Sequence, residues 1–292
     1  MRVARSPTEL ERRPRAVAIG TFDGVHVGHQ AVIERARSAG VCPTVVTFDP
    51  HPREVLGYEV QLLTTTERRL ELFEALGVEE TLVVEFTPEV AGLTPEEFAS
   101  SYVVSIGAER VVAGEAFRFG RGRSGGLDVF ASLGMATDVT PLVPDVSSTL
   151  IRQLAAVGDV RGAARLLGRP LEVEGNVVSG DARGGTLGYP TANLRIGHSL
   201  LVPAFGIYAG SARGHRAAIS IGVNPHYGGA ERRIEAFLLD FEGDLYGQRV
   251  VVELWERLRD EAAFETEAEL IAQIGRDVAA TQAATRPGSG AP

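Results

Sequence analysis

The sequence predicts an α/β protein with two parts: a doubly wound, Rossmann-like N-terminal domain, then an all-β antiparallel domain closed by a helix. Two observations carry this prediction. Up to about Leu167, apolar strand-like runs alternate with helix-like stretches, which is typical of a parallel sheet covered by helices. From Leu171 onward, strand-like runs follow one another across Gly, Pro and Asn turns, which is typical of an antiparallel barrel or sandwich.

In the first part, four short apolar runs are expected to form strands: Ala16–Gly20, Val41–Phe48, Thr81–Phe86 and Arg110–Gly114. The stretches between them show helical spacing of apolar residues. They carry Val32, Ile33 and Ala36, then Leu70, Phe73 and Leu76 ending at Gly77, then Thr94–Ile106. Parallel sheets bind ligands at the carboxyl ends of their strands. We therefore expect a site after the first, second and fourth strands, where the unusual residues stand.

Two short helices, Ser147–Gly158 and Val160–Leu167, precede a break at Gly168-Arg-Pro. The boundary is expected near Gly168, giving domains 1–168 and 169–292. The expected strands beyond it are Leu171–Val178, Gly206–Arg213, Arg216–Gly222, Arg233–Asp240 and Arg249–Trp255. Thr266 and Glu269 form a capping box for a last helix with Leu270, Ile274 and Val278 on one face. The tail from about Thr281 is expected to be disordered.

Composition restricts the class of protein. The 292 residues are 44% hydrophobic and 23% charged, as in an ordinary globular protein. A net charge of −9 argues against nucleic acid as a partner. No apolar run approaches the roughly 18 residues of a membrane span, and the N-terminus lacks a secretory signal core. The single cysteine, Cys42, excludes an internal disulfide and a cysteine zinc cage. We expect a cytoplasmic protein, at most a weak homo-oligomer.

The first candidate site is the loop Gly20–Gln30 between a strand and a helix. Gly20, Gly24 and Gly28 let the backbone approach a ligand, and the free N–H groups of the following helix attract phosphate. His26 and His29, three residues apart, are able to face the same phosphoryl group and to stabilise its charge. The alternative is a glycine-rich turn with two surface histidines. A metal site is disfavoured because no third ligand stands nearby.

Three further blocks of the first part carry residues suited to a ring-shaped or phosphate-bearing ligand. His51 lies between Pro50 and Pro52 at the end of the second strand, a rigid lip for a ring-shaped substrate. Phe117 and Phe119 alternate with arginines, which offers stacking surfaces beside phosphate-pairing groups, although either ring would equally serve the core. The third block is Ser147-Ser148-Thr149, with Arg152 one turn further on. Ordinary helix capping alone would explain the serines.

The second part contains a glycine-rich block, Gly180–Asn193. Its glycines permit a loop that folds over phosphates. Thr191 and Asn193 offer hard oxygen ligands that suit Mg²⁺ bound with ATP. Glu235 lies on a strand face that it shares with Phe237 and Leu239. A carboxylate on an apolar face is costly without a task or a partner, so we expect a functional group or a cross-strand salt bridge.

These blocks resemble, in order and over nearly the whole chain, those of bacterial bifunctional riboflavin kinase/FAD synthetases. The Gly20–Gln30 loop, Thr47–Pro52, Leu63-Thr64-Thr65, Phe117–Gly125 and Ser147–Arg152 resemble the adenylyltransferase domain, and Gly180–Asn193 resembles the kinase domain. The resemblance implies a Rossmann-like nucleotidyltransferase domain and an antiparallel β-barrel kinase domain. It also implies that riboflavin is phosphorylated to FMN and that FMN is adenylylated to FAD with release of pyrophosphate, both with Mg-ATP, flavins being substrates and products rather than prosthetic groups.

The resemblance assigns roles to residues of this sequence. Catalytic roles fall to Glu235, as general base of the kinase, and to His26, His29 and Arg152. Metal ligands are Thr191 and Asn193. Nucleotide binding falls to Gly20, Phe22, Asp23, Gly24, Gly28, Ser147, Ser148, Thr149, Gly180, Arg183, Gly188 and Pro190. Flavin binding falls to Phe48, His51, Pro52, Phe117, Phe119, Asp240 and Tyr246.

The sequence departs from the family pattern at two places. Ala116 stands where relatives usually carry Asp or Asn, which would weaken adenylylation or shift nucleotide choice unless Glu115 offsets it. Val223 and His226 replace two threonines of another block. Ala116 motivates one alternative, a kinase-only enzyme or a paralogue with a different nucleotide or flavin. A non-catalytic flavin-binding protein and a generic nucleotidyltransferase are the others.

Overall fold

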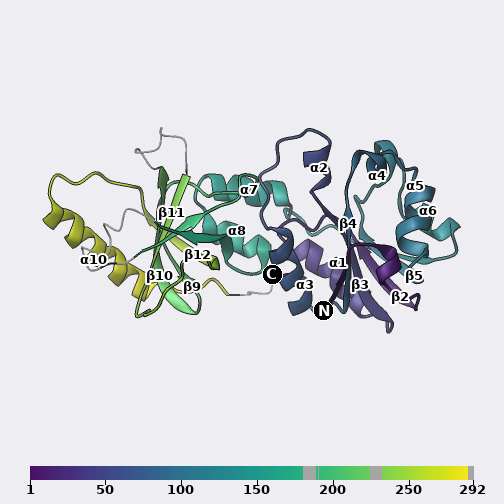
Figure 1. The fold of residues 1–292 in the computed structure, drawn as a ribbon, viewed down its shortest axis with the longest axis horizontal. Coiled ribbons are helices and arrows are strands. Elements are labelled where there is room, and N and C mark those ends of the chain that lie inside the picture. Colours follow the sequence, from purple (N-terminus) through teal and green to yellow (C-terminus); the bar gives the residue numbers. More distant parts are fainter. Residues whose placement is uncertain (180–188, 190, 224–231, 289–292) are drawn as a thin grey trace. The chain divides into compact units, whose positions relative to one another are not determined.

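The computed structural model describes residues 1–179, 189, 191–223 and 232–288 (Figure 1). The chain divides into two compact units, Met1–Ser147 and Ser148–Pro292. This division lies before helices α7 (Ser148–Ala156) and α8 (Val160–Leu167), which the sequence had placed with the first domain. In the structure these helices pack on each other, and α8 packs on barrel strands of the second unit.

The first unit is built on a six-stranded sheet in the order β1-β4-β3-β2-β5-β6, and every pair in it is parallel. The predicted doubly wound sheet is therefore confirmed. The strands are β1 (Arg2–Ala4), β2 (Arg15–Ile19), β3 (Cys42–Asp49), β4 (Glu80–Glu85), β5 (Ala108–Gly114) and β6 (Ala136–Thr140). The winding direction reverses between β2 and β5, so the loops that follow these two strands border the crevice where such sheets bind ligands.

Helices cover both faces of the sheet. The longer ones are α1 (Val27–Arg37), α3 (Thr66–Ala75) and α6 (Leu127–Ser132). The stretch predicted as one helix over Thr94–Ile106 is α5 (Pro95–Phe98) continued by a π-helical turn, η2 (Ala99–Val104). The short elements are α2 (Pro52–Val55), α4 (Pro88–Gly92), and the 3₁₀ turns η1 (Pro7–Glu9) and η3 (Arg121–Arg123).

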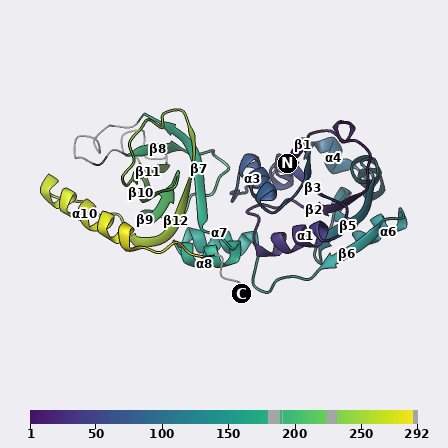
Figure 2. The ribbon, with the colours of Figure 1, turned by 90° about the horizontal axis from the view of Figure 1, so that it is seen from below.

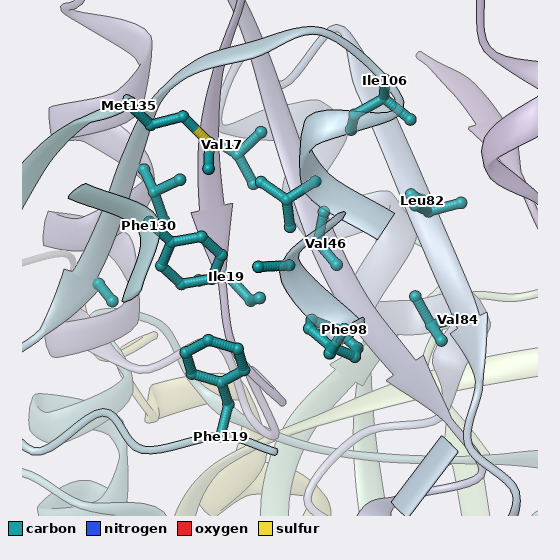
Figure 3. Packing of buried hydrophobic residues seen from close by; sticks show 14 of the residues in the cluster. Val17, Ile19, Val46, Leu82, Val84, Phe98, Ile106, Phe119, Phe130 and Met135 are labelled. Atoms are coloured by element: carbon teal, nitrogen blue, oxygen red, sulfur yellow. The ribbon is translucent and has the colours of Figure 1, made fainter. Parts of the chain in front are cut away.

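Alternation along β2 divides the core into two layers. Val17 and Ile19 face a cluster that includes Phe98 and Phe130. Figure 3 shows the Phe130 ring close to Ile19. Ala16 and Ala18 face the other side, where α1 and α3 pack. Small alanine side chains bring those helices close to the sheet, which places the beginning of α1 directly beyond the end of β2.

The second unit contains a closed six-stranded barrel in the order β10-β11-β8-β7-β12-β9, whose strands pair antiparallel (Figure 2). This confirms the barrel rather than the sandwich. The strands are β7 (Leu171–Val178), β8 (Ala192–Arg195), β9 (Gly206–Ala212), β10 (His215–Val223), β11 (Arg232–Leu238) and β12 (Arg249–Arg259). Closure leaves no free sheet edge and brings β8 beside β11.

Helix α10 (Glu267–Ala283) ends the described fold and packs on β9 and β10. The Thr266–Glu269 capping box predicted from the sequence is present. The tail expected to be disordered from about Thr281 is helical to Ala283. The Arg216 guanidinium donates to the carbonyl oxygens of Thr281 and Ala284 at 2.9 and 2.7 Å. The composition of the tail alone does not reveal these hydrogen bonds to Arg216. Within the described residues, no helix has both the length and the apolar character of a membrane span.

Candidate active sites

The loop after β2 is tightly wound and leads straight into α1. Gly24 adopts a φ of +82° and the non-glycine residues Phe22 and Val25 adopt φ values of 52° and 42°. Such conformations cost of order 1–3 kcal/mol each in non-glycine residues and persist where surrounding structure imposes them. His26 caps α1, because its Nδ1 accepts the His29 backbone N–H at 3.2 Å. The loop thus presents a helix N-terminus and an imidazole together.

The two predicted histidines are in direct contact. Their rings stack with centroids 3.5 Å apart and an interplanar angle of 17°. Because His26 Nδ1 accepts a hydrogen bond, the proton of its neutral ring lies on Nε2. His29 Nδ1 is buried and has no hydrogen-bond partner within the described residues. Burial, together with the charges of His26 and Arg69, holds the pKa of His29 well below its ordinary value of 6.5.

Asp23 and Phe22, expected at the nucleotide, make their described contacts inside the protein. Asp23 Oδ1 accepts the backbone N–H groups of Leu63 and Thr64 at 2.9 and 3.2 Å. Phe22 packs edge-on against Phe73 with ring centroids 5.6 Å apart. These two side chains fix the loop to the protein beneath it. Gly20 and Gly28 are partly exposed, whereas Gly24 is buried and donates its N–H to the Thr64 hydroxyl at 3.1 Å.

Of the predicted flavin contacts, two belong to the core. Phe48 is buried and packs against Phe86 and Phe98. Phe119 is buried and stacks on Phe130 with centroids 4.7 Å apart, as Figure 3 shows. Their rings are therefore packed against protein, the alternative that the sequence had left open for Phe119.

Two other residues expected beside a flavin differ in exposure, since His51 is buried and Phe117 is only partly buried. Phe117 is half-buried and stacks on Phe119 with centroids 5.4 Å apart. His51 caps α2, whose first residue is Pro52, with its Nδ1 accepting the Arg53 N–H at 3.2 Å. Ala116, in the turn after β5, is exposed like its neighbour Glu115. The position that relatives fill with Asp or Asn therefore faces solvent.

The phosphate-binding block divides between the two units. Ser147 ends the first unit, while Ser148, Thr149 and Arg152 begin the second on α7. The structure thus places the histidine pair and Arg152 on separate units, and their meeting in one site stays a prediction.

In the second unit, the three residues of the predicted kinase site come together. Asn193 on β8 is the register partner of Glu235 on β11. The Thr191 hydroxyl donates to Glu235 Oε2 at 3.1 Å. Arg233 bridges the group: its Nε lies 2.7 Å from Glu235 Oε1 and donates to Asn193 Oδ1 at 2.9 Å. Two residues that lie far from Glu235 in the sequence are therefore its direct neighbours.

The other expected residues of this domain are placed only in part. Gly180, Arg183, Gly188, Pro190 and His226 lie outside the described residues. Tyr189, between them, packs edge-on against Phe237 with centroids 5.3 Å apart. Asp240 adopts a φ of 56° in the turn after β11, and Tyr246 is exposed.

The donor set of the barrel suits a hard cation. A hydroxyl, an amide carbonyl and a carboxylate oxygen, from Thr191, Asn193 and Glu235, are the oxygen ligands that Mg²⁺ prefers. In the described part of the chain, no three His, Cys, Asp or Glu side chains gather as a metal site. The residues therefore fit Mg²⁺ brought with a nucleotide, which keeps most of its water and phosphate ligands.

Sequence reasoning missed two arginines at these sites. Arg69 lies at helical spacing from Phe73 and Leu76 and therefore shares the buried face of α3. A charged residue on an otherwise apolar helix face is the feature of the sequence that could have indicated its role. Arg233 precedes Glu235 by two residues and shares its strand face. An arginine and a glutamate two residues apart on one strand face are the feature of the sequence that could have indicated this ion pair.

A parallel sheet with a phosphate-type loop at its switch point, joined to a closed barrel with a carboxylate and hard oxygen ligands, defines a two-domain phosphoryl- and nucleotidyl-transferring enzyme. Comparison with known proteins narrows this class. A family model described as FAD synthetase matches residues 8–149. A second, described as riboflavin kinase, matches residues 167–285.

Relatives of known name agree over most of the chain. The bifunctional riboflavin kinase/FMN adenylyltransferase of Listeria monocytogenes is 35% identical, with 92% of each chain covered. That of Bacillus subtilis is 36% identical, with 91% of each covered. The chain therefore belongs to the bifunctional riboflavin kinase/FMN adenylyltransferase family, and it is an enzyme of flavin cofactor biosynthesis that uses ATP.

One solved structure shares the fold under a different description. A chain described as a macrolide-efflux protein from Streptococcus pneumoniae is 32% identical, with a TM-score of 0.85 and coverage of 96% of this chain and 98% of that one. The description concerns that protein. The present chain matches the FAD synthetase and riboflavin kinase family models over residues 8–149 and 167–285.

Proposed function

We propose that the barrel phosphorylates riboflavin with Glu235 as general base. The carboxylate takes the proton of the ribityl 5′-hydroxyl while that oxygen attacks the γ-phosphorus of ATP. Thr191 and Asn193 hold Mg²⁺, which neutralises charge on the phosphates when it is bound. The gathering of Thr191, Asn193 and Glu235 at 3.1 Å and at one register position is the observation that supports this proposal.

The parallel-sheet unit then joins AMP to FMN. The FMN phosphate attacks the α-phosphorus of ATP and pyrophosphate leaves. The His26 Nε2–H donates to a phosphoryl oxygen, and His29 and Arg152 contribute to stabilising the developing charge. The stacked pair at the N-terminus of α1 supports this assignment. No covalent enzyme intermediate is required, because positioning and electrostatics suffice.

The remaining partners follow from this chemistry. The ligands are ATP, riboflavin, FMN and FAD, with Mg²⁺ accompanying the nucleotide, and the enzyme works in the cytoplasm without nucleic acid or membrane. A kinase-only enzyme is the second candidate, and the exposed Ala116 is the observation that favours it.

Incubation of the purified protein with riboflavin, ATP and Mg²⁺, followed by chromatography of the flavins, tests both candidates. FMN with FAD is expected, whereas FMN alone would favour the kinase-only enzyme. Glu235→Gln is expected to lower FMN formation by about 10²–10⁴-fold, the range for loss of a general base. The same variant should convert supplied FMN to FAD at the parent rate. Glu242→Gln, an exposed carboxylate nearby in sequence, is the matched control. Parent-like FMN formation by Glu235→Gln would refute the base assignment.

A further inference from the structure

We propose that Arg69 is a positioning residue for adenylylation, which fixes the loop of the histidine pair against the end of β3; this rests on the proposed function of that loop. Arg69 lies in the first turn of α3 and is 3% exposed. A buried guanidinium is costly unless its hydrogen bonds are satisfied and serve a purpose. The contacts of Arg69 identify that purpose.

The guanidinium joins three segments of the first unit. Its Nη1 donates to the carbonyl oxygen of Thr21 at 2.7 Å, in the loop after β2. Its Nη2 donates to the carbonyl oxygen of Phe48 at 3.2 Å, at the end of β3, and to the Thr66 hydroxyl at 2.7 Å. Thr21 lies in the Gly20–Gln30 loop that carries the histidine pair, and Phe48 precedes the lip that carries His51. The planar guanidinium therefore sets the distance between the two segments that border the candidate site, the loop after β2 and the end of β3.

The carbonyl partners explain why the residue is arginine. A fork of several N–H donors is able to reach Thr21 and Phe48 at once, whereas an ammonium group is a compact point charge with a different geometry. Asp23, bonded to the N–H groups of Leu63 and Thr64, ties the same loop to the segment just before α3. The loop is thus held through α3 and its approach by two charged side chains.

Arg69 also acts on His29 through its charge. Burial lowers the pKa of His29, and the charges of His26 and Arg69 lower it further. These two are the charged or titratable groups that act on the imidazole within the described residues, and the Phe22 ring packs against it with centroids 5.3 Å apart. The positive charge of Arg69 therefore adds to the larger effects of burial and of His26 in disfavouring the protonated form of His29.

Two substitutions separate geometry from charge. Arg69→Met removes both, and Arg69→Lys keeps the charge but not the fork. Arg68→Met is the matched control, since Arg68 lies on the same turn and pairs with Glu71 at 2.6 Å. For each variant, kcat and KM for FAD formation from supplied FMN would be measured from pH 5.5 to 9. Kinase activity on the same chain reports that the protein is intact.

Both Arg69 variants are expected to lower kcat for FAD formation by about 10–100-fold, the effect of misplacing reacting groups by about 1 Å. Kinase activity should change less than about twofold, since the kinase site lies in the other unit. Arg69→Met should also shift the acid limb of the pH profile to higher pH, while Arg69→Lys should leave it in place. If Arg69→Met does not fold, the kcat of Arg69→Lys for FAD formation decides the matter.

Parent-like kcat in both Arg69 variants and an unchanged acid limb in Arg69→Met, with only lower thermal stability, would overturn the proposal and leave Arg69 a residue of the fold alone. A parent protein that forms no FAD would instead refute the proposed adenylylation, independently of Arg69. Equal losses in Arg68→Met would also overturn it, because the loss would then not depend on the contacts of Arg69 with Thr21 and Phe48.

Discussion

Arg233 Nε lies 2.7 Å from Glu235 Oε1 and donates at 2.9 Å to Asn193 Oδ1, so one guanidinium occupies two of the oxygens assigned to the kinase chemistry. The Asn193 amide oxygen has two lone pairs, and this bond uses one of them while the guanidinium places a positive charge beside it. We therefore expect Arg233 to oppose the binding of a cation at Asn193. The guanidinium is an internal competitor of the metal.

Arg233→Met is therefore expected to strengthen binding of a divalent cation with ATP to the barrel. Removal of one positive charge beside the ligands should lower the dissociation constant of Mn²⁺ in the presence of ATP by about 3–10-fold, a modest effect because the site is partly exposed to solvent. Electron paramagnetic resonance of free Mn²⁺ measures this directly. Arg195→Met, an exposed arginine at the end of β8, is the control. Weaker Mn²⁺ binding by Arg233→Met would contradict the competition.

The lowered pKa of His29 predicts that the first unit loses stability in mild acid. The folded state binds fewer protons than the unfolded state wherever the folded pKa lies below the unfolded value of 6.5. Stability is therefore fully present above that value and falls as the pH drops from it toward the folded pKa, by at most about 1.4 kcal/mol per pH unit for one group.

Amide hydrogen exchange of α1 between pH 7.5 and 5.5 measures this loss, after correction for the intrinsic pH dependence of exchange. His29→Asn should show a smaller loss of protection over the same range, because it removes the group that must take up the proton. Equal losses in the two proteins would show that other groups carry the acid sensitivity.

The parts of the fold that could be predicted were those with continuous apolar runs. β2, β3 and β4 are buried on both faces over most of their length, and β5 is buried over residues 111–113. The strands that were missed are short or half polar. β1 has three residues, β6 is mostly accessible, and β8 has four residues directly after the glycine-rich block. The local sequence of these three strands does not distinguish a strand from a loop. Their conformation comes from pairing with the other strands of the sheet or barrel.

The roles of Thr191, Asn193 and Glu235 came from the resemblance to the family. That these residues meet follows from the barrel, which pairs β8 with β11, and the spacing of the residues in the sequence does not contain it. The burial of Phe48 and Phe119 was not predictable, because an aromatic residue beside a loop serves a core or a ligand equally well. Arg69 donates to main-chain carbonyl oxygens. Because every residue carries such an oxygen, the sequence does not reveal these partners.

Ala116 is the departure from the family pattern whose effect a single substitution tests. Its side chain is exposed in the turn after β5, so a larger polar residue fits without disturbing the core. Ala116→Asn is expected to lower KM for ATP in FAD formation by about 3–10-fold, the contribution of roughly one hydrogen bond. Kinase activity serves as the internal control. If Glu115 offsets the alanine, Glu115→Ala will weaken FAD formation and Ala116→Asn will have little effect.

Two glycines of the second unit predict opposite effects of alanine on stability. A Cβ at Gly210, on β9, would lie 1.8 Å from the carbonyl oxygen of Glu253 on β12, and both are backbone positions of a closed barrel. Because neither strand is able to move away alone, Gly210→Ala should lower the free energy of unfolding by at least about 1–3 kcal/mol. Gly275 lies inside α10 with nothing within 4 Å, so Gly275→Ala should raise it by about 0.5–1 kcal/mol.

Urea unfolding followed by the fluorescence of Trp255 measures both effects, because this buried residue of β12 is the single tryptophan of the chain. A Gly210→Ala protein as stable as the parent would mean that β9 and β12 are further apart than the paired register requires. Destabilisation by Gly275→Ala would mean that another group covers the accessible face of α10 and leaves no room for the added methyl group.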